Sequence, residues 1–342
     1  MRHVNIPIFI PHLGCPNQCV FCNQRTISGV REFDPEDVKK NIDEALNTIS
    51  ADDEVEIAFF GGSFTGIDRD LMIKLLKIGH AYIEDGRVKS IRCSTRPDYI
   101  DTEIIDLLKK YGVSTVELGL QSTSDKVLGL SKRGHYFEAE RNACELIVKS
   151  GINLGGQMMI GLPGSDVDSE LETARFIISS GASEARIYPT VVFRETELCD
   201  MTLKGEYTPL ELEDAISRSA LVLNLFLEAG VEVIRIGLQA NENLSNESSY
   251  LAGPNHPALG ELVIGELYYN KIKKILEEAG TFREENISVV VSRGSLSKVT
   301  GQNKRNKKRL TEKYPKIRFA ESDRVSGYEI LIETQNGEYR CT

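Results

Sequence analysis

The feature that most constrains the fold is an alternation of short apolar segments with longer amphipathic segments through the first 240 residues. The short segments are typical of buried strands, and the longer ones carry apolar residues at helical spacing. This alternation predicts βα units around a largely parallel sheet, which right-handed crossovers would curl into a full or partial (β/α) barrel. Strands are expected at 5–11, 55–60, 89–94, 114–118, 153–159, 185–189 and 232–236.

Helix signals lie between these strands. Asp34 is a candidate N-cap, Pro35 suits the first helical position, and two acidic residues follow near the positive end of the dipole. The segment Thr208-Pro209-Leu210-Glu211 repeats this start signal. Further helices are expected at 71–83, 102–111, 137–150 and 169–180.

The alternation ends near residue 240. Residues 242–255 are polar and rich in Asn, Ser and Gly, and this composition predicts a long loop. A helix at 257–278, a strand at 287–292, a polar helical stretch and strands at 317–320 and 328–333 are expected beyond it. We therefore predict a barrel over residues 1–240 and a linker with a small α/β appendage over 241–342.

Charge and hydropathy exclude some classes of protein. The net charge of -10 over 342 residues argues against a surface coated by nucleic acid, and leaves room for a local basic patch. No apolar run approaches the roughly 20 residues that cross a bilayer, and the first residues lack the layout of a secretory signal. We expect a cytoplasmic protein without membrane contact, of undetermined oligomeric state.

Three of the seven cysteines lie within eight residues, directly after the first predicted strand. Cys15, Cys19 and Cys22 do not resemble part of a disulfide framework in a chain of this size. Catalytic residues of parallel barrels gather at this end of the strands, and thiolates select zinc or iron-sulfur clusters. The segment therefore predicts a metal site.

Two alternatives follow from three neighbouring cysteines. In a 4Fe-4S cluster they would leave one iron open, and that iron could chelate the amino and carboxylate groups of S-adenosylmethionine. Alternatively, His12 completes a zinc site. Phe21, just before the third cysteine, could pack on an adenine ring or serve as a core aromatic residue.

Two adjacent glycines, Gly61 and Gly62, follow the second predicted strand and precede Ser63. They suit either a close backbone approach to a ligand or a plain turn.

Further motifs follow in order along the chain: Ser94-Thr95-Arg96-Pro97-Asp98, Glu117-Leu118-Gly119-Leu120-Gln121-Ser122, Arg133-Gly134-His135 and 156–164. Together with the cysteines and the glycine pair, over about residues 1–240, the sequence resembles radical S-adenosylmethionine proteins. It is most similar to the radical domain of the elongator catalytic subunit, which modifies wobble uridines of transfer RNA. The resemblance implies a radical barrel with a 4Fe-4S cluster on the three cysteines.

The resemblance also implies roles for individual residues. Arg186 and Tyr188 on the sixth strand would face the substrate as catalytic residues, although Tyr188 could instead pack structurally. A second set would bind S-adenosylmethionine: Phe21, Gly61, Gly62, Ser63, Ser94, Gln121, Arg133 and Gln157. The polar members of this set could instead be interior packing residues. Arg133 and His135 could pair with Glu138 or Glu140 at a helix start.

The implied reaction is reductive cleavage of S-adenosylmethionine to a 5′-deoxyadenosyl radical, which abstracts hydrogen from a transfer RNA nucleoside or a related substrate. A flavodoxin- or ferredoxin-type protein would donate the electron. The elongator subunit has a longer first cysteine spacing and an acetyltransferase domain that this sequence does not show, so its carboxymethylation reaction is not implied. The alternatives are a relative of coproporphyrinogen oxidase acting on a small molecule, or a non-catalytic protein that binds a cluster or zinc.

A basic stretch stands out over residues 298–318 in an otherwise acidic chain. It could contact RNA phosphates or form a solvated helix face, and Tyr314 is its one aromatic residue. Of the isolated cysteines, Cys199 could face the substrate pocket or simply pack in the interior. The basic residues are Lys298, Lys304, Arg305, Lys307, Lys308, Arg309, Lys313, Lys316 and Arg318.

Overall fold

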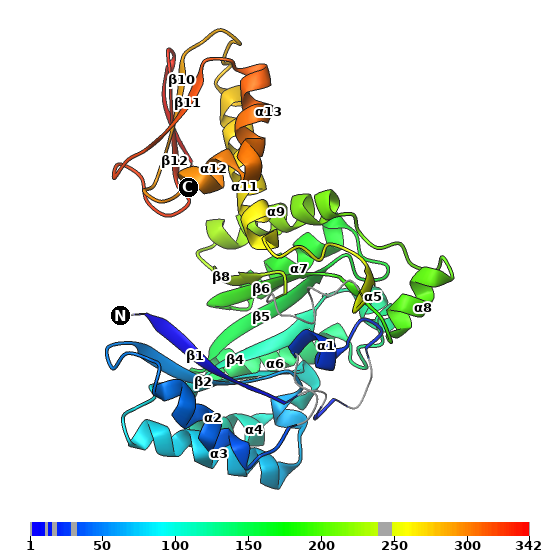
Figure 1. The fold of residues 1–342 in the computed structure, drawn as a ribbon. Coiled ribbons are helices and arrows are strands. Elements are labelled where there is room, and N and C mark those ends of the chain that lie inside the picture. The colour runs from blue at the N-terminus through cyan, green and yellow to red at the C-terminus, as the bar shows by residue number, and fades with distance from the viewer. Residues whose placement is uncertain (1, 11–12, 16–18, 29–32, 239–247, 342) are drawn as a thin grey trace.

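A seven-stranded parallel sheet forms the larger part of the protein (Figure 1). The structure is a computed structural model, and it describes residues 2–10, 13–15, 19–28, 33–238 and 248–341. The strands follow chain order and curve into an open half-barrel, which confirms the predicted α/β class. They are β1 (His3–Phe9), β2 (Glu54–Phe60), β3 (Ser90–Thr95), β4 (Val113–Gln121), β5 (Asn153–Ile160), β6 (Glu184–Pro189) and β8 (Glu232–Ile236).

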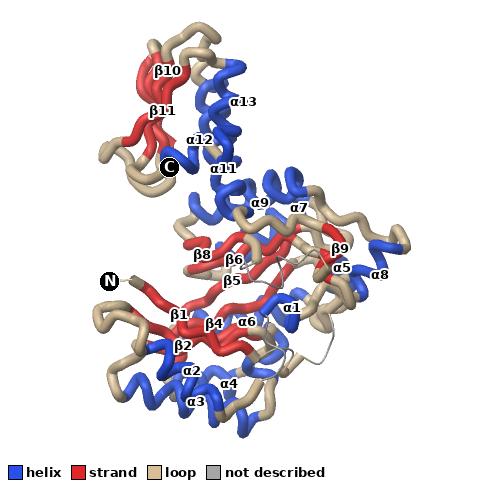
Figure 2. The backbone as a smooth tube through the Cα atoms, viewed as in Figure 1, coloured by secondary structure: helices blue, strands red, loops and turns tan. Residues whose placement is uncertain are grey.

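Long helices cover the outer face of this sheet (Figure 2). The sheet and these helices bury a continuous apolar core that includes Ile57, Leu75, Val116 and Ile147. The helices are α2 (Asp37–Leu46), α3 (Arg69–Glu84), α4 (Thr102–Lys110), α6 (Phe137–Ser150), α7 (Val167–Ser179) and α9 (Leu212–Glu228). Shorter elements near the carboxyl ends of the strands are α1 (Gln24–Ser28), α5 (Asp125–Leu130) and α8 (Glu197–Leu203).

Both helices begin later in the chain than their start signals predicted. Asp34 is not the N-cap of α2: it accepts a hydrogen bond from the Glu36 N–H at 2.9 Å in the turn before the helix, and Glu36 occupies the N-cap position. The start predicted at Thr208 is wrong, because α9 begins at Leu212. Leu210 instead packs across Gly161, where a Cβ atom would lie 2.5 Å from its Cδ1. This contact with the end of β5 keeps the segment outside the helix.

A second sheet, in the order β11-β10-β12-β13, lies beyond helix α11 (Leu259–Glu278). The first half of α11 packs on the main core through Leu259 and Val263, and its second half packs on the small sheet through Ile272 and Leu276. The division at residue 240 therefore stays a prediction. The remaining elements are β10 (Ile287–Val291), α12 (Leu296–Thr300), a 3-10 turn (Gln302–Lys304), α13 (Arg305–Lys313), β11 (Ile317–Glu321), β12 (Ile330–Thr334) and β13 (Gly337–Cys341).

A short two-stranded sheet lies beside the half-barrel. Its strands, β7 (Val192–Phe193) and β9 (Tyr250–Ala252), pair antiparallel. None of the helices in the described ranges has the length and apolar character that crossing a membrane requires.

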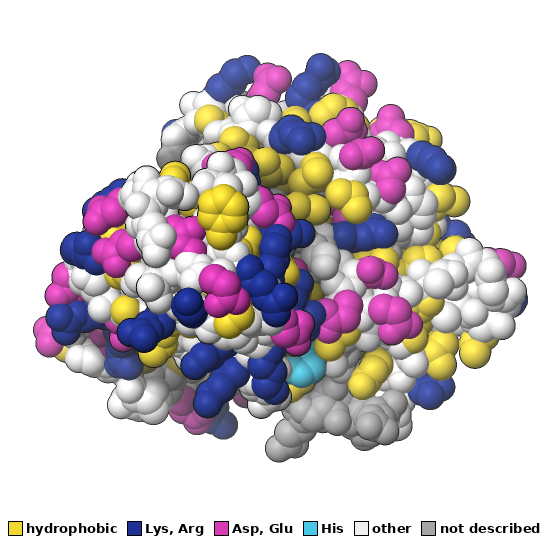
Figure 3. Space-filling model, turned by 90° about the horizontal axis from the view of Figure 1, so that it is seen from above, with side chains coloured by type: hydrophobic (Ala, Val, Ile, Leu, Met, Phe, Trp, Pro, Cys, Tyr) yellow, Lys and Arg dark blue, Asp and Glu magenta, His cyan; other side chains and the backbone are white. Residues whose placement is uncertain are grey.

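The face seen from above carries Lys and Arg side chains interspersed with acidic ones (Figure 3).

Candidate functional site

The cysteine segment packs directly against the turn that follows β2. The Ser63 N–H donates to the Leu13 carbonyl at 3.1 Å. A Cβ atom on Gly62 would lie 2.3 Å from that same carbonyl oxygen, and one on Gly14 would lie 2.2 Å from the Ser63 oxygen. Gly14 and Gly62 therefore let the cysteine segment and the turn after β2 pack backbone against backbone. The close backbone approach expected at Gly62 is made by another part of the chain.

The three cysteines line one small cavity of about 110 Å³. The Cys22 N–H donates to the Cys19 carbonyl at 3.0 Å, which closes a tight turn between them. Burial raises the pKa of Cys22 to about 12. The free thiol of Cys22 therefore holds its proton at neutral pH.

The arrangement bears on the choice between zinc and a cluster. Within the ranges that the structure describes, no three His, Cys, Asp or Glu side chains are grouped for one metal ion. In a cluster each cysteine binds a different iron, so such a group is not required. His12, the predicted fourth zinc ligand, lies outside the described residues.

Two arginines supply positive charge beside the thiols. Arg133 Nη1 lies 3.3 Å from Cys19 Sγ, and its Nη2 donates to the Gly119 carbonyl. Arg96 makes two hydrogen bonds to Asp98, at 2.9 and 2.8 Å, and donates to the Arg133 carbonyl at 2.5 Å. Arg96, whose role was not predicted from the sequence, therefore helps to hold Arg133 in place.

His135 does not line the cysteine cavity. Its Nε2 lies 3.1 Å from Glu140 Oε1, and its Nδ1 lies 3.5 Å from Asp98. Burial raises the pKa of Glu140 to about 7, with His135 opposing the shift. Although burial alone would raise the pKa of Asp98, hydrogen bonds from His135 and Arg96 hold it well below its usual range. The helix-start ion pair was thus the right alternative for His135, whereas Arg133 faces the cysteines.

Gln121 has an unusual backbone at the end of β4. The pairing of β4 with β5 shifts between Gly119 and Gln121, and Gln121 has a φ of 73°. Its buried Oε1 has no hydrogen-bond partner among the described residues. A left-handed non-glycine residue with a free buried acceptor is typical of a ligand site.

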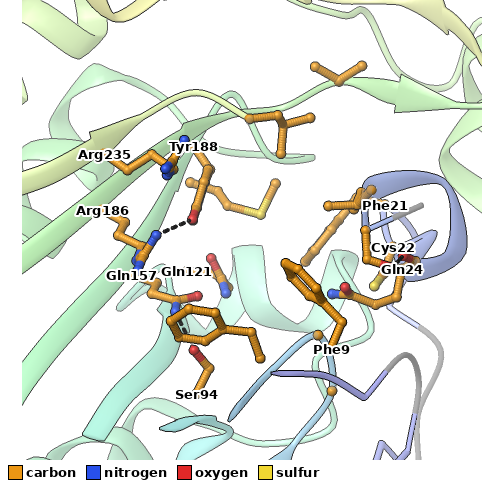
Figure 4. Close-up of a pocket in the computed structure, with 18 of the residues that line it drawn as sticks. Phe9, Phe21, Cys22, Gln24, Ser94, Gln121, Gln157, Arg186, Tyr188 and Arg235 are labelled. Atoms are coloured by element: carbon orange, nitrogen blue, oxygen red, sulfur yellow. Dashed lines mark hydrogen bonds between the residues drawn. The ribbon is translucent and has the colours of Figure 1, made fainter. Parts of the chain in front are cut away.

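A larger cavity of about 490 Å³ adjoins the cysteine cavity, and this volume is within the range of small-molecule sites. Gln157 Nε2 donates to Ser94 Oγ at 3.2 Å (Figure 4). It also donates to Glu117 Oε2 at 3.0 Å. Of the predicted cofactor residues, Ser63 and Arg133 line only the smaller cavity. The others line both: Phe21, Gly61, Gly62, Ser94, Gln121 and Gln157.

The two predicted catalytic residues lie on the larger cavity (Figure 4). Arg186 donates two hydrogen bonds to the buried Glu117, and its Nη1 lies 3.5 Å from the Tyr188 hydroxyl. Burial raises the pKa of Tyr188, with Arg186 opposing the shift. Glu117 therefore fixes the guanidinium of Arg186. Arg186 in turn orients the phenol of Tyr188, which keeps its proton.

Several residues of the larger cavity were given no role from the sequence. Phe9 on β1 and Arg235 on β8 line this cavity. Arg235 lies inside a strand that was predicted correctly. A charged residue inside a predicted strand was the sequence signal that could have marked it as a site residue. Cys199 is buried in the small apolar cluster around α8, where it packs with Val192, so it does not face the cavity.

Family models match in two consecutive blocks. Residues 9–177 match the radical SAM superfamily, and residues 182–269 match the radical SAM C-terminal domain. The matched region contains the three cysteines and strands β2 to β6 and β8 of the main sheet. The chain belongs to the radical SAM superfamily. It is therefore an enzyme of that class, as predicted.

Relatives of this radical SAM enzyme differ in length. A tRNA uridine(34) acetyltransferase of Methanocaldococcus jannaschii is 27% identical over 245 residues, covering 59% of this chain and 45% of the relative. The chain therefore spans less than half of that protein. An uncharacterized protein of the same organism is 29% identical over 290 residues, covering 81% of this chain and 85% of that protein.

Among solved structures, the archaeal Methanocaldococcus infernus Elp3 superposes with a TM-score of 0.61 at 23% identity. The match covers 81% of this chain and 63% of that one, so the radical SAM enzyme shares its fold.

Proposed function

We propose that the radical SAM enzyme holds a 4Fe-4S cluster on Cys15, Cys19 and Cys22, cleaves S-adenosylmethionine reductively and acts on a transfer RNA nucleoside. One observation carries this proposal: all three thiols face a cavity that adjoins the larger cavity lined by the predicted cofactor and substrate residues. Three sulfur donors suit a cluster with an open iron, and the unpartnered Gln121 Oε1 beside them suits a bound ligand.

When bound, the reduced cluster would supply one electron to the sulfonium of S-adenosylmethionine, giving methionine and a 5′-deoxyadenosyl radical. The residues of the chain have separate tasks around that chemistry. Arg133 offsets the negative charge of the Cys19 thiolate, and Gln121 offers an acceptor to the ligand. Phe9 and Phe21 supply apolar walls that exclude water from a reactive site.

The electron donor is proposed to be a flavodoxin- or ferredoxin-type protein. Cys15 is exposed at the carboxyl edge of the half-barrel, while Cys19 is buried. The exposed side leaves an approach for a partner protein to the cluster.

Two observations support a transfer RNA substrate. Curated relatives are named tRNA uridine(34) acetyltransferases. In the basic stretch, Arg305, Arg309, Lys313 and Lys316 pair with glutamates on neighbouring elements. The others are exposed and form no ion pair with any described residue, so they remain available to phosphates: Lys298, Lys304, Lys307, Lys308 and Arg318.

Metal and product analysis test the cofactor. Anaerobically reconstituted protein should contain about four irons and four sulfides per chain, and a strong reductant should yield 5′-deoxyadenosine. The single variants Cys15→Ala, Cys19→Ala and Cys22→Ala should lose both properties. Cys341→Ser, on β13 of the other sheet, is the matched control. Zinc in place of iron, or iron retained in all three variants, would contradict the proposal.

Charge reversal tests the transfer RNA. Bulk transfer RNA should bind Lys307→Glu/Lys308→Glu about tenfold or more weakly than the unmodified protein, because each lost phosphate contact lowers affinity. The control, Lys77→Glu/Lys110→Glu, makes the same charge change on the helices of the half-barrel. Equal weakening in both variants would assign the effect to net charge. Nucleoside mass spectrometry of transfer RNA after incubation then identifies the product, and unchanged nucleosides would oppose the assignment of this substrate.

A further inference from the structure

Two arginines stand side by side on the wall of the larger cavity. Arg186 on β6 and Arg235 on β8 are direct partners in the pairing of these parallel strands. Both side chains line the cavity (Figure 4). Neighbouring like charges on adjacent strands destabilise a sheet, so this placement has an energetic cost that the fold alone does not require.

The two arginines differ in how their charge is compensated. Arg186 is held by two hydrogen bonds from its guanidinium to the buried carboxylate of Glu117. Arg235 is half-buried, and no described residue forms a hydrogen bond or an ion pair with it. The wall of this cavity includes no Asp or Glu among the described residues. The chain has 51 acidic and 41 basic residues, so acidic side chains are not scarce.

The position of Arg235 separates it from the metal site. Figure 4 shows Arg235 and Tyr188 together on one wall, and Phe21 and Cys22 on the opposite side of the cavity. Arg235 lines the larger cavity and is not part of the smaller one around the cysteines. A group bound by Arg235 therefore belongs to a molecule that occupies the far end of the larger cavity.

We infer that Arg235 binds an oxyanion of the substrate, a phosphate or a carboxylate, at the end of the cavity remote from the cysteines. This inference rests on the proposed function and specifies its substrate as an anion at that point. The planar guanidinium of arginine matches both oxyanions with paired N–H donors. Tyr188 adds a hydroxyl whose oxygen faces Arg186 and whose proton is free to donate to the same group.

Calorimetric titration of the reconstituted full chain tests the inference with defined probes. Uridine 5′-monophosphate and uridine differ only by a phosphate, and succinate supplies a carboxylate without a nucleoside. The unmodified protein should bind uridine 5′-monophosphate at least about tenfold more tightly than uridine, or bind succinate measurably. A preference for the nucleotide assigns the oxyanion to a phosphate, and binding of succinate alone assigns it to a carboxylate.

Three variants complete the test. Arg235→Gln should lose about tenfold or more in affinity for whichever anion binds, while Arg235→Lys, which keeps the charge without the planar fork, should lose less. The control Arg175→Gln makes the same charge change on the exposed face of α7 and should bind as the unmodified protein does. Melting temperatures verify that each variant is folded.

The inference is overturned if the unmodified protein binds neither anion in preference to uridine. It is also overturned if folded Arg235→Gln and Arg175→Gln bind the anion equally. Failure of the proposed function has a different signature, because it appears as missing iron or missing 5′-deoxyadenosine in the unmodified protein, whatever the titrations give.

Discussion

Arg133 lies with its guanidinium 3.3 Å from the sulfur of Cys19, although 114 residues separate them in the sequence. The contact forms because the turn after α5 returns Arg133 to the carboxyl end of β4, where Gly119 accepts a second hydrogen bond from it. A cation at this distance stabilises a thiolate and any electron added beside it.

Arg133→Gln should therefore lower the reduction potential of the reconstituted cluster. Removing one positive charge and one donor to Cys19, a proposed cluster ligand, should shift the potential by roughly 30 to 60 mV toward negative values. A redox titration followed by electron paramagnetic resonance measures this shift. Lys132→Gln, which removes the neighbouring exposed charge that pairs with Glu197, should leave the potential close to its original value. Equal shifts in both variants would argue against the Cys19 contact.

Gly62→Ala should loosen the cysteine segment. The added Cβ would lie 2.3 Å from the Leu13 oxygen and 2.6 Å from the Ile10 oxygen, so two backbones must separate. We expect a loss of about 1–3 kcal/mol in unfolding free energy, measured by denaturant titration, and a lower iron content after reconstitution. Gly129→Ala, at an exposed position of α5 with open space around it, should keep its stability and its iron. An unaffected Gly62→Ala protein would show that the segment adjusts without strain.

Glu117→Gln should be strongly destabilising. Its carboxylate, 1% exposed, compensates Arg186 and lies 3.4 Å from the buried Arg92. Breaking a buried pair leaves an uncompensated charge, and a loss of about 3 kcal/mol is expected in chemical denaturation. Glu54→Gln, which breaks the exposed pair with Lys89, should cost less than about 1 kcal/mol. Similar losses in the two variants would mean that Arg186 finds another partner.

Glu140 should make stability depend on pH. Its pKa is raised from 4.5 to about 7 by burial, so the folded chain binds this proton more tightly than the unfolded chain does. Stability from this group is full below pH 4.5 and decreases as the pH rises toward 7. In Glu140→Gln the unfolding free energy should fall less over this range, by roughly 1–3 kcal/mol. Glu138→Gln, on an exposed acid of the same helix, should follow the unmodified protein, and parallel curves for all three proteins would contradict this assignment.

Local patterns were sufficient for the larger elements. All seven strands of the main sheet lie where alternation predicted them, although the end of the first prediction, at Pro11, lies outside the described residues. The prediction missed strands β7, β9 and β13 and the short helices α1, α5 and α8, because segments of this length contain too few periods to stand out. Strand β9 lies inside the segment 242–255, which was predicted to be a loop throughout. The start signal at Thr208 was wrong because packing of Leu210 on Gly161 outweighed the local preference.

The sequence likewise predicted some features of the site and not others. The cysteine spacing and the order of motifs along the chain led to the superfamily, and the structure gathers every predicted cofactor residue around two adjoining cavities. Their individual roles stay predictions. The partners of these residues were not visible in the sequence, since Glu117 meets Arg186 across two strand pairings, and Arg235 faces the cavity only through the register of β8 on β6.

The sequence by itself therefore determined the class of fold and the close spacing of the three cysteines, because periodicity and motif spacing act over a few neighbouring residues. Only the tertiary structure decided which charges are compensated and which are free. Strand register, the shift in pairing between Gly119 and Gln121, and the contact of Gly62 with Leu13 set distances between residues remote in the chain. Electrostatic and hydrogen-bond energies depend on those distances, and no local pattern encodes them.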